Sequence, residues 1–188
     1  MQQVIIVLAD TTEQAEKNEE FIELVQAADM EIKETFTQNL KSITLRTYIG
    51  TGKCEEIHAY LQEQEIQRVV FNHDLSPLQI RNLEEILQTP VMDRTELILA
   101  IFESRAVTRT ARLQIECAQL KKLLPRLIGA NTQLGRQSGS GKNKGAGEKQ
   151  LELDRRRINA RIQELQRELK KIEAQRFNQR RARQKSML

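Results

Sequence analysis

Cations and glycines gather in one short segment of the chain, between Gly135 and Arg157. The segment reads GRQSGSGKNKGAGEKQLELDRRR. Its glycines permit close backbone approach and positive φ angles, and its lysines and arginines are the side chains that contact phosphate groups. The chemistry indicated is phosphate contact, and the alternative is an ordinary flexible loop beside a solvated helix face. The candidate loop glycines are Gly135, Gly139, Gly141, Gly145 and Gly147.

The charge of the whole chain supports the phosphate interpretation. The formal net charge is +4, but residues 1–103 carry −11 and residues 104–188 carry +15. This asymmetry indicates a polyanionic partner for the second half only, which the acidic half would help to orient by repulsion. The second half has one aromatic residue, Phe177, so recognition of folded RNA by backbone and shape is favoured over base stacking. The candidate RNA-binding residues are Arg136, Lys142, Lys144, Lys149, Arg155, Arg156 and Arg157.

Two Gly-Lys pairs raise the possibility of a nucleotide-binding phosphate loop. The Walker pattern needs a Gly five positions before the second Gly, and Ser or Thr after the Lys. The pair Gly141-Lys142 has Arg136 and Asn143 at those positions, and the pair Gly52-Lys53 has Thr47 and Cys54. Both pairs fail at both positions, so no NTPase loop is expected in this chain.

Other catalytic and metal-binding patterns are weak. Cys54 and His58 lie four residues apart, but a zinc site needs three or four ligands, and the chain has two His and two Cys. A packed Cys and a surface His are the favoured interpretation. His73-Asp74 precedes Ser76-Pro77, and Asp74 is expected to serve a turn and cap rather than act as a catalytic acid. We therefore predict no catalytic residue and no metal site.

The cellular compartment follows from what the sequence lacks. Two cysteines 63 positions apart are no disulfide framework. The apolar run 4–9 is too short for a secretory signal and has no basic residues before it. No stretch approaches 18 apolar residues. A cytoplasmic, soluble monomer that binds no membrane is expected.

The first part of the chain, residues 1–103, alternates strand and helix patterns. Such alternation predicts an α/β fold, with a small, mostly parallel sheet and flanking helices. The strands that begin with apolar residues near Val4, Val69 and Val91 are expected at its centre, and 44–48 prolongs or follows the second strand. We expect strands at 4–9, 31–37, 68–72 and 90–92, and helices at 13–28, 53–64, 77–87 and 94–103.

The second part, residues 104–188, has the spacing of a coiled coil. Apolar residues recur at steps of three and four in two stretches, separated by a glycine-rich tip loop at 129–147. This predicts a long antiparallel α-helical hairpin whose second helix, from about 148 to 183, is roughly 50 Å long. After Ile172 that helix is expected to fray or to continue into something outside the chain. The seam residues are Leu113, Cys117, Leu120, Leu124, Leu127, Ile158, Ile162, Leu165, Leu169 and Ile172.

Four segments together resemble the N-terminal region of HflX-type GTPases, and they cover nearly the whole chain. They are YIGTGKCEEI (48–57), FNHDLSPLQIRNLEEIL (71–87), VMDRTELILAIFESRAVTRTARLQIECAQLKKLLPRL (91–127) and the tip with QLELDRRRI (150–158). The resemblance implies an α/β subdomain followed by a helical hairpin. It further implies binding to rRNA of the large ribosomal subunit near the peptidyl transferase centre, in a protein that splits or rescues ribosomes under stress.

The chain departs from the family pattern in two ways. The family's Gly-Pro-Gly-Glu element corresponds here to Gly145-Ala146-Gly147-Glu148, and losing the Pro predicts a looser loop. The family's GTPase domain would start just after Leu188, so a fragment of a longer GTPase is favoured over a protein without the GTP switch. GTP and Mg²⁺ are expected only with that missing domain, and this chain is expected not to be an enzyme by itself.

Two other functions remain open from the residues alone. The α/β domain could bind a nucleotide at the carboxyl ends of its strands, with an activity of its own, although no glycine fingerprint follows the first strand. The hairpin could instead be a coiled-coil module for a protein partner, in which case its seam residues would pair between chains.

Overall fold

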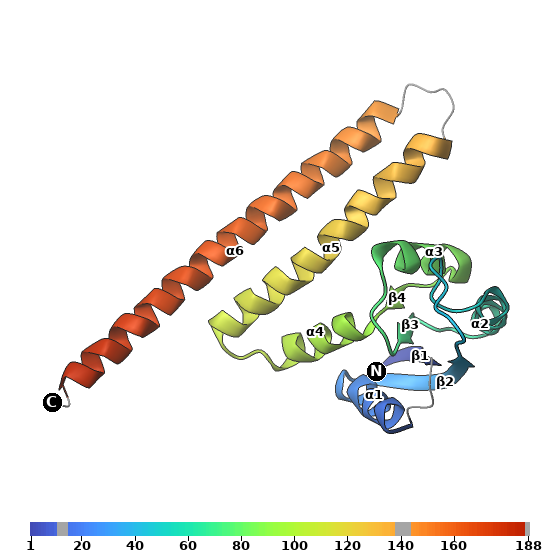
Figure 1. Ribbon diagram of the computed structural model, residues 1–188, viewed down its shortest axis with the longest axis horizontal. Coiled ribbons are helices and arrows are strands. Elements are labelled where there is room, and N and C mark those ends of the chain that lie inside the picture. The colour runs from blue at the N-terminus through green and yellow to red at the C-terminus, as the bar shows by residue number, and fades with distance from the viewer. Residues whose placement is uncertain (11–14, 138–143, 187–188) are drawn as a thin grey trace. The chain divides into compact units, whose positions relative to one another are not determined.

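The chain folds into two compact units, Met1–Arg105 and Ala106–Leu188. The computed structural model, shown in Figure 1, describes residues 1–10, 15–137 and 144–186.

A four-stranded parallel sheet forms the centre of the first unit. Its strands are β1 (Gln2–Asp10), β2 (Met30–Asn39), β3 (Arg68–Phe71) and β4 (Val91–Met92), in the order β2-β1-β3-β4. Every pairing is parallel, which confirms the predicted α/β class. The expectation that β4 lies at the centre is wrong, because β4 pairs only with β3. Val91 and Met92 are apolar because helices on both faces bury them at this edge.

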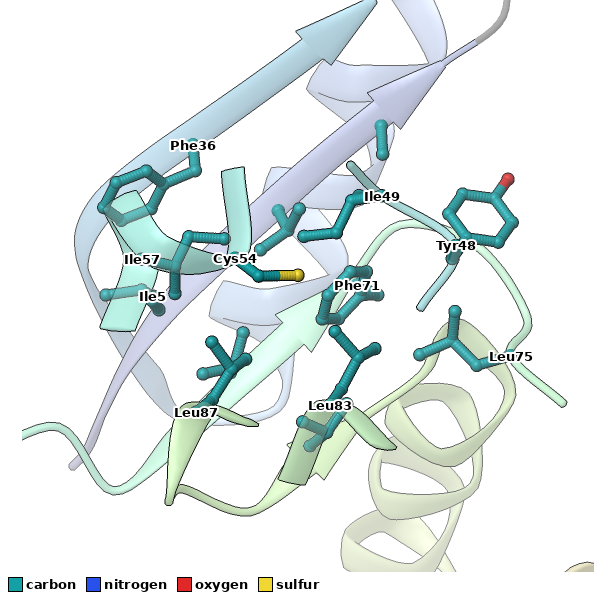
Figure 2. Close-up of a cluster of buried hydrophobic side chains, with 14 of the residues drawn as sticks. Ile5, Phe36, Tyr48, Ile49, Cys54, Ile57, Phe71, Leu75, Leu83 and Leu87 are labelled. Atoms are coloured by element: carbon teal, nitrogen blue, oxygen red, sulfur yellow. The ribbon is translucent and has the colours of Figure 1, made fainter. Parts of the chain in front are cut away.

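Two hydrophobic clusters cover opposite faces of the sheet, because alternate residues of a strand point to opposite sides. Helices α2 (Thr51–Glu63) and α3 (Pro77–Leu87) pack on the face of Ile5 and Phe71, as Figure 2 shows. Helices α1 (Ala15–Ala27) and α4 (Arg94–Arg105) pack on the face of Ile6 and Val70. The resulting helix–sheet–helix layers explain why β1 is apolar on both sides.

A local signal in the sequence sets the start of α3. Ser76 caps α3 and forms a capping box with Gln79, and Pro77 occupies the first turn, as the sequence predicted. Helix α2 begins at Thr51, so Lys53 is helical and its ammonium lies 2.6 Å from Glu56. The segment 44–48 forms an isolated antiparallel bridge rather than a strand, because Tyr48 adopts a positive φ of 68°.

The second unit is the predicted antiparallel helical hairpin, made by α5 (Arg109–Gln137) and α6 (Lys144–Ser186). Pairs across it run in opposite directions along the two helices: Arg109 meets Glu168, and Glu116 meets Arg161. The seam predicted from the heptad spacing forms the core, except that Leu127 is not part of the packed cluster. Its buried residues are Leu113, Cys117, Ile162 and Leu165, with Leu120, Leu124, Ile158, Leu169 and Ile172 packed against them.

The predicted tip loop at 129–147 is largely helical, which corrects the sequence expectation. Helix α5 continues through Gly129 and Gly135 to Gln137, and α6 begins at Lys144. A glycine costs about 1 kcal/mol relative to alanine inside a helix, and a helix already nucleated along a packed seam can offset that cost. Residues 138–143 lie outside the described residues. The stretch after Ile172 is also helical, to Ser186.

None of the helices in the described parts of the chain is long and apolar enough to cross a membrane.

The hairpin should depend on its most buried seam residue. Leu165 is fully buried, so Leu165→Ala should lower the free energy of unfolding of this unit by about 2–5 kcal/mol, because a cavity replaces packed methyl groups. Denaturant titration followed by helical circular dichroism measures this loss. Leu153→Ala is the matched control on the same helix: Leu153 is 46% exposed, and its change should stay within about 0.5 kcal/mol. Equal losses in both variants would contradict the role of the seam.

Candidate functional site: a basic hairpin end and a pocket on the sheet

The predicted RNA-binding cations come from one end of the hairpin. Because α5 and α6 are antiparallel, the C-terminal turns of α5, with Arg136, and the N-terminal turns of α6, with Lys144 and Lys149, belong to the same end. Lys142, Gly139 and Gly141 lie outside the described residues. The topology therefore brings the helix turns that carry Arg136, Lys144 and Lys149 to one end of the hairpin, and their role in RNA binding stays a prediction.

Arg155, Arg156 and Arg157 lie further along α6 and are solvent-exposed. Arg156 donates to Glu152 at 3.1 Å and Arg157 to Asp154 at 3.4 Å, while Arg155 lies 3.8 Å from Glu152. Exposed ion pairs of this kind contribute only about 0–1 kcal/mol each to the stability of the fold. The guanidinium groups can therefore exchange these carboxylates for phosphate oxygens at little cost.

Arg161 differs from these three arginines, and the sequence analysis did not single it out. Its Nε and Nη2 donate to the two carboxylate oxygens of Glu116 on α5, at 2.7 and 3.1 Å. Its Nη1 donates to Glu164 at 2.8 Å. These two carboxylates, Glu116 first, raise the pKa of Arg161. The group joins the two helices, so it is a structural contact rather than a candidate for phosphate.

A pocket at the carboxyl ends of β1 and β3 is a second candidate site. The sequence left a nucleotide site open at this edge of the sheet but did not identify the residues that line it. The chain leaves β1 for β2 on one side and returns for β3 on the other, so the strand order reverses between β1 and β3. Open α/β sheets bind ligands at this position. A cavity of about 300 Å³ lies there, lined by Asp10, Lys17, Glu20, Asn72, His73 and Arg94.

A hydrogen-bond network built on Asn72 orders the floor of this pocket. Its side-chain oxygen accepts from the Ala9 N–H at 3.0 Å, and its amide nitrogen lies 3.2 and 3.3 Å from the two Asp10 oxygens. His73 Nε2 lies 2.8 Å from Asp10 Oδ1. Asp10 and Asn72 are buried, so the pocket holds a fixed carboxylate beside an imidazole.

Two cations line the pocket, and an aromatic ring packs against its imidazole. Tyr48 stacks on His73 with ring centroids 5.4 Å apart, and burial, with a smaller effect of Asp10, raises the pKa of its phenol. Arg94 donates to Glu20 at 2.8 Å, and Lys17 is exposed. Polar and cationic groups thus line one cavity, which suits a small ligand with anionic and hydrogen-bonding groups.

The remaining candidates take structural roles. Asp74 accepts from the backbone N–H of Thr95 in the first turn of α4, a structural role, although on another helix than the turn at Ser76-Pro77 that the sequence suggested. Cys54 is buried, and burial raises its pKa. No cluster of three or more potential metal-ligating His, Cys, Asp or Glu side chains occurs within residues 1–10, 15–137 and 144–186.

Comparison with known families divides the chain much as the fold does. A family model described as GTP-binding GTPase N-terminal matches residues 15–103. A second, described as GTP-binding GTPase middle region, matches residues 105–183.

Two named relatives are GTPases called HflX. The chain is 39% identical over 185 residues to the GTPase HflX of Caldanaerobacter subterraneus subsp. tengcongensis, covering 98% of this chain and 43% of the relative. It is 41% identical over 168 residues to the GTPase HflX of Escherichia coli (strain K12), covering 89% of this chain and 39% of the relative. The chain spans less than half the length of these curated relatives.

Solved structures support the fold. The chain is similar to SsGBP in complex with GDP, with a TM-score of 0.72 at 24% identity, covering 95% of this chain and 46% of that one. It is also similar to a GTP-binding protein from Sulfolobus solfataricus in complex with GDP, with a TM-score of 0.67 at 24% identity, covering 93% and 46%. At this identity the likeness concerns the fold alone.

The pocket network should also contribute to stability. Asn72→Ala removes the acceptor for the Ala9 N–H and the donor to Asp10, so it should lower the free energy of unfolding by about 1–3 kcal/mol. Urea titration of the whole chain measures the loss. Asn18→Ala is the control, because Asn18 contributes only its 3.3 Å contact with Asn72 to this network. If Asn72→Ala lowers the free energy of unfolding no more than the control does, the proposed role of the Asn72 network is wrong.

Proposed function

This chain belongs to the HflX family of GTPases and corresponds to the family's N-terminal and middle regions. From this membership we propose that it binds the large ribosomal subunit. Its partner is rRNA near the peptidyl transferase centre, and its role is in the splitting or rescue of ribosomes under stress. The chain acts in the cytoplasm as a monomer. The observation that carries the proposal is the set of cations that one end of an antiparallel hairpin gathers.

The charge distribution supports a polyanionic partner. The net charge of +15 on residues 104–188 exceeds what solubility needs. The net charge of −11 on residues 1–103 repels the same polyanionic partner. A field of this kind presents the hairpin to RNA and turns the α/β unit away. Arg155, Arg156 and Arg157 can join the contact because only exposed carboxylates hold them.

The hairpin has the dimensions of a probing arm. Its longer helix, α6, has 43 residues, which at ~1.5 Å per residue gives about 65 Å. The seam stiffens it, because Leu165 and Ile162 are buried against α5. The same burial argues against the coiled-coil partner module, since the seam residues already pair within one chain.

GTP hydrolysis belongs to a part of the family outside these 188 residues. Neither of the two Gly-Lys pairs fits a phosphate loop in sequence, and Lys53 lies inside α2 beside Glu56. We therefore assign GTP and Mg²⁺ to that other part, and binding to this one.

Salt dependence of ribosome binding tests the proposal. If about six phosphates are contacted, log K should fall against log salt with a slope near −5, because each contact releases counterions. Co-sedimentation of the 188-residue chain with 50S subunits across a salt series measures it. Lys142→Ala with Lys144→Ala should weaken binding and flatten the slope by about 2. Lys33→Ala with Lys53→Ala removes the same charge from the α/β unit and is the control. No binding at low salt, or a flat response, would contradict RNA binding.

A second candidate function is nucleotide binding by the α/β unit, which the pocket between β1 and β3 favours. Its cations could hold a phosphate, Asp10 a ribose hydroxyl, and Tyr48 with His73 a base. Calorimetric titration of the chain with ATP or GTP should then release heat that Lys17→Ala reduces, while Lys33→Ala, on the same unit, leaves it unchanged. An absence of heat at millimolar nucleotide would remove this candidate.

A further inference from the structure

The end of α6 extends beyond the helix that it packs against. Helix α5 begins at Arg109, whose guanidinium lies 2.9 Å from Glu168, and Thr110 accepts from Arg176 at 3.0 Å. Every side chain of 173–184 is exposed. Residues 174–186, here called the α6 extension, therefore project past the start of the only helix that pairs with α6 in the described part of the hairpin unit.

The seam of α6 changes chemistry where the extension begins. The apolar positions that end at Leu169 and Ile172 continue, at the same steps of three and four, to Arg176, Gln179 and Arg183. A face prepared for another helix would carry apolar residues at these positions. The extension is therefore not an unfilled coiled-coil seam, and a polar partner suits it better.

The charge of the extension identifies the kind of polar partner. It carries five Lys and Arg and no Asp or Glu. Elsewhere on α6, arginines lie one turn from a carboxylate, as Arg156 does with Glu152. Arg180 and Arg181 make no hydrogen bond or ion pair within the described residues, and they lie on the exposed surface. A cluster of cations without acids is complementary to a polyanion.

One aromatic residue accompanies these cations. Phe177 is 59% exposed and lies three and four positions before Arg180 and Arg181, so the three side chains share one side of the helix. An exposed aromatic ring beside cations is the combination that single-stranded or looped nucleic acid engages, with phosphates on the cations and a base on the ring.

We propose that the α6 extension is a second RNA-contacting surface, in which Arg180 and Arg181 bind phosphates and Phe177 stacks on an unpaired base. It adds to the contact at the tip and rests, for its partner, on the proposed RNA binding of the hairpin. From Lys144 to Arg180 the helix spans 36 residues, about 54 Å at ~1.5 Å per residue. A large folded RNA is big enough to engage both ends at once, and such double engagement raises the overall affinity above that of either contact alone.

The test compares two double variants of equal charge on one helix. Arg180→Ala with Arg181→Ala should weaken co-sedimentation of the 188-residue chain with 50S subunits roughly tenfold or more and make the slope of log K against log salt less negative by about 2. Lys170→Ala with Lys171→Ala, exposed positions beside the seam, should leave the slope unchanged. Phe177→Ala should weaken binding roughly tenfold with little change in slope. Alanine favours the helix, so each variant keeps α6 intact.

The outcomes separate this contact from the function that it extends. Binding by the wild-type chain together with equal slopes for the two double variants would overturn the extension as a contact and leave RNA binding at the tip. No binding by the wild-type chain at low salt would overturn the RNA function as a whole. If the wild-type chain is a dimer and the double variant Arg180→Ala with Arg181→Ala is a monomer that binds ribosomes equally well, the surface serves self-association. That result would overturn the proposal.

Discussion

The second unit depends on one constraint: burial of its apolar seam must outweigh the repulsion among its own positive charges. The part of the chain that forms the hairpin carries a formal charge of +15, and compaction of like charges is unfavourable. Ile162 and Leu165 on α6, with Leu113 and Cys117 on α5, supply the buried surface that opposes this repulsion. The Arg161–Glu116 contact adds an attraction across the same interface. The seam can therefore hold the basic residues on two packed helices despite their repulsion.

The same constraint explains how charge is distributed along α6. Where the seam is apolar, acids such as Glu152, Asp154 and Glu164 lie one turn from arginines and reduce the repulsion within the packed part of the hairpin. Where the seam ends after Ile172, the acids end after Glu173 as well. The part of the helix after Glu173 carries no acids and needs no such compensation for packing.

The sequence was sufficient for features that depend on local spacing. Period-two and buried apolar runs predicted the parallel strands, steps of three and four predicted the hairpin, and Ser76-Pro77 predicted the start of α3. It was misleading where a local preference competes with tertiary packing. Glycines 129 and 135 suggested a loop, but the helix extends through them because the packed turns before them already carry its nucleation cost. The apolar edge strand β4 looked central because helices, not strands, bury it.

The residues that line the pocket could not be predicted from the sequence, because they depend on strand order rather than on spacing. Asp10 and His73 are 63 positions apart, and no motif links them. They meet because β1 and β3 are neighbours in the order β2-β1-β3-β4, and parallel strands end at the same edge. In the hairpin, by contrast, the candidate cations are close in sequence. They come to one end of the unit because the chain reverses once between α5 and α6. A site made by sequence neighbours is visible as composition, whereas a site made by topology becomes visible only when the strand order is known.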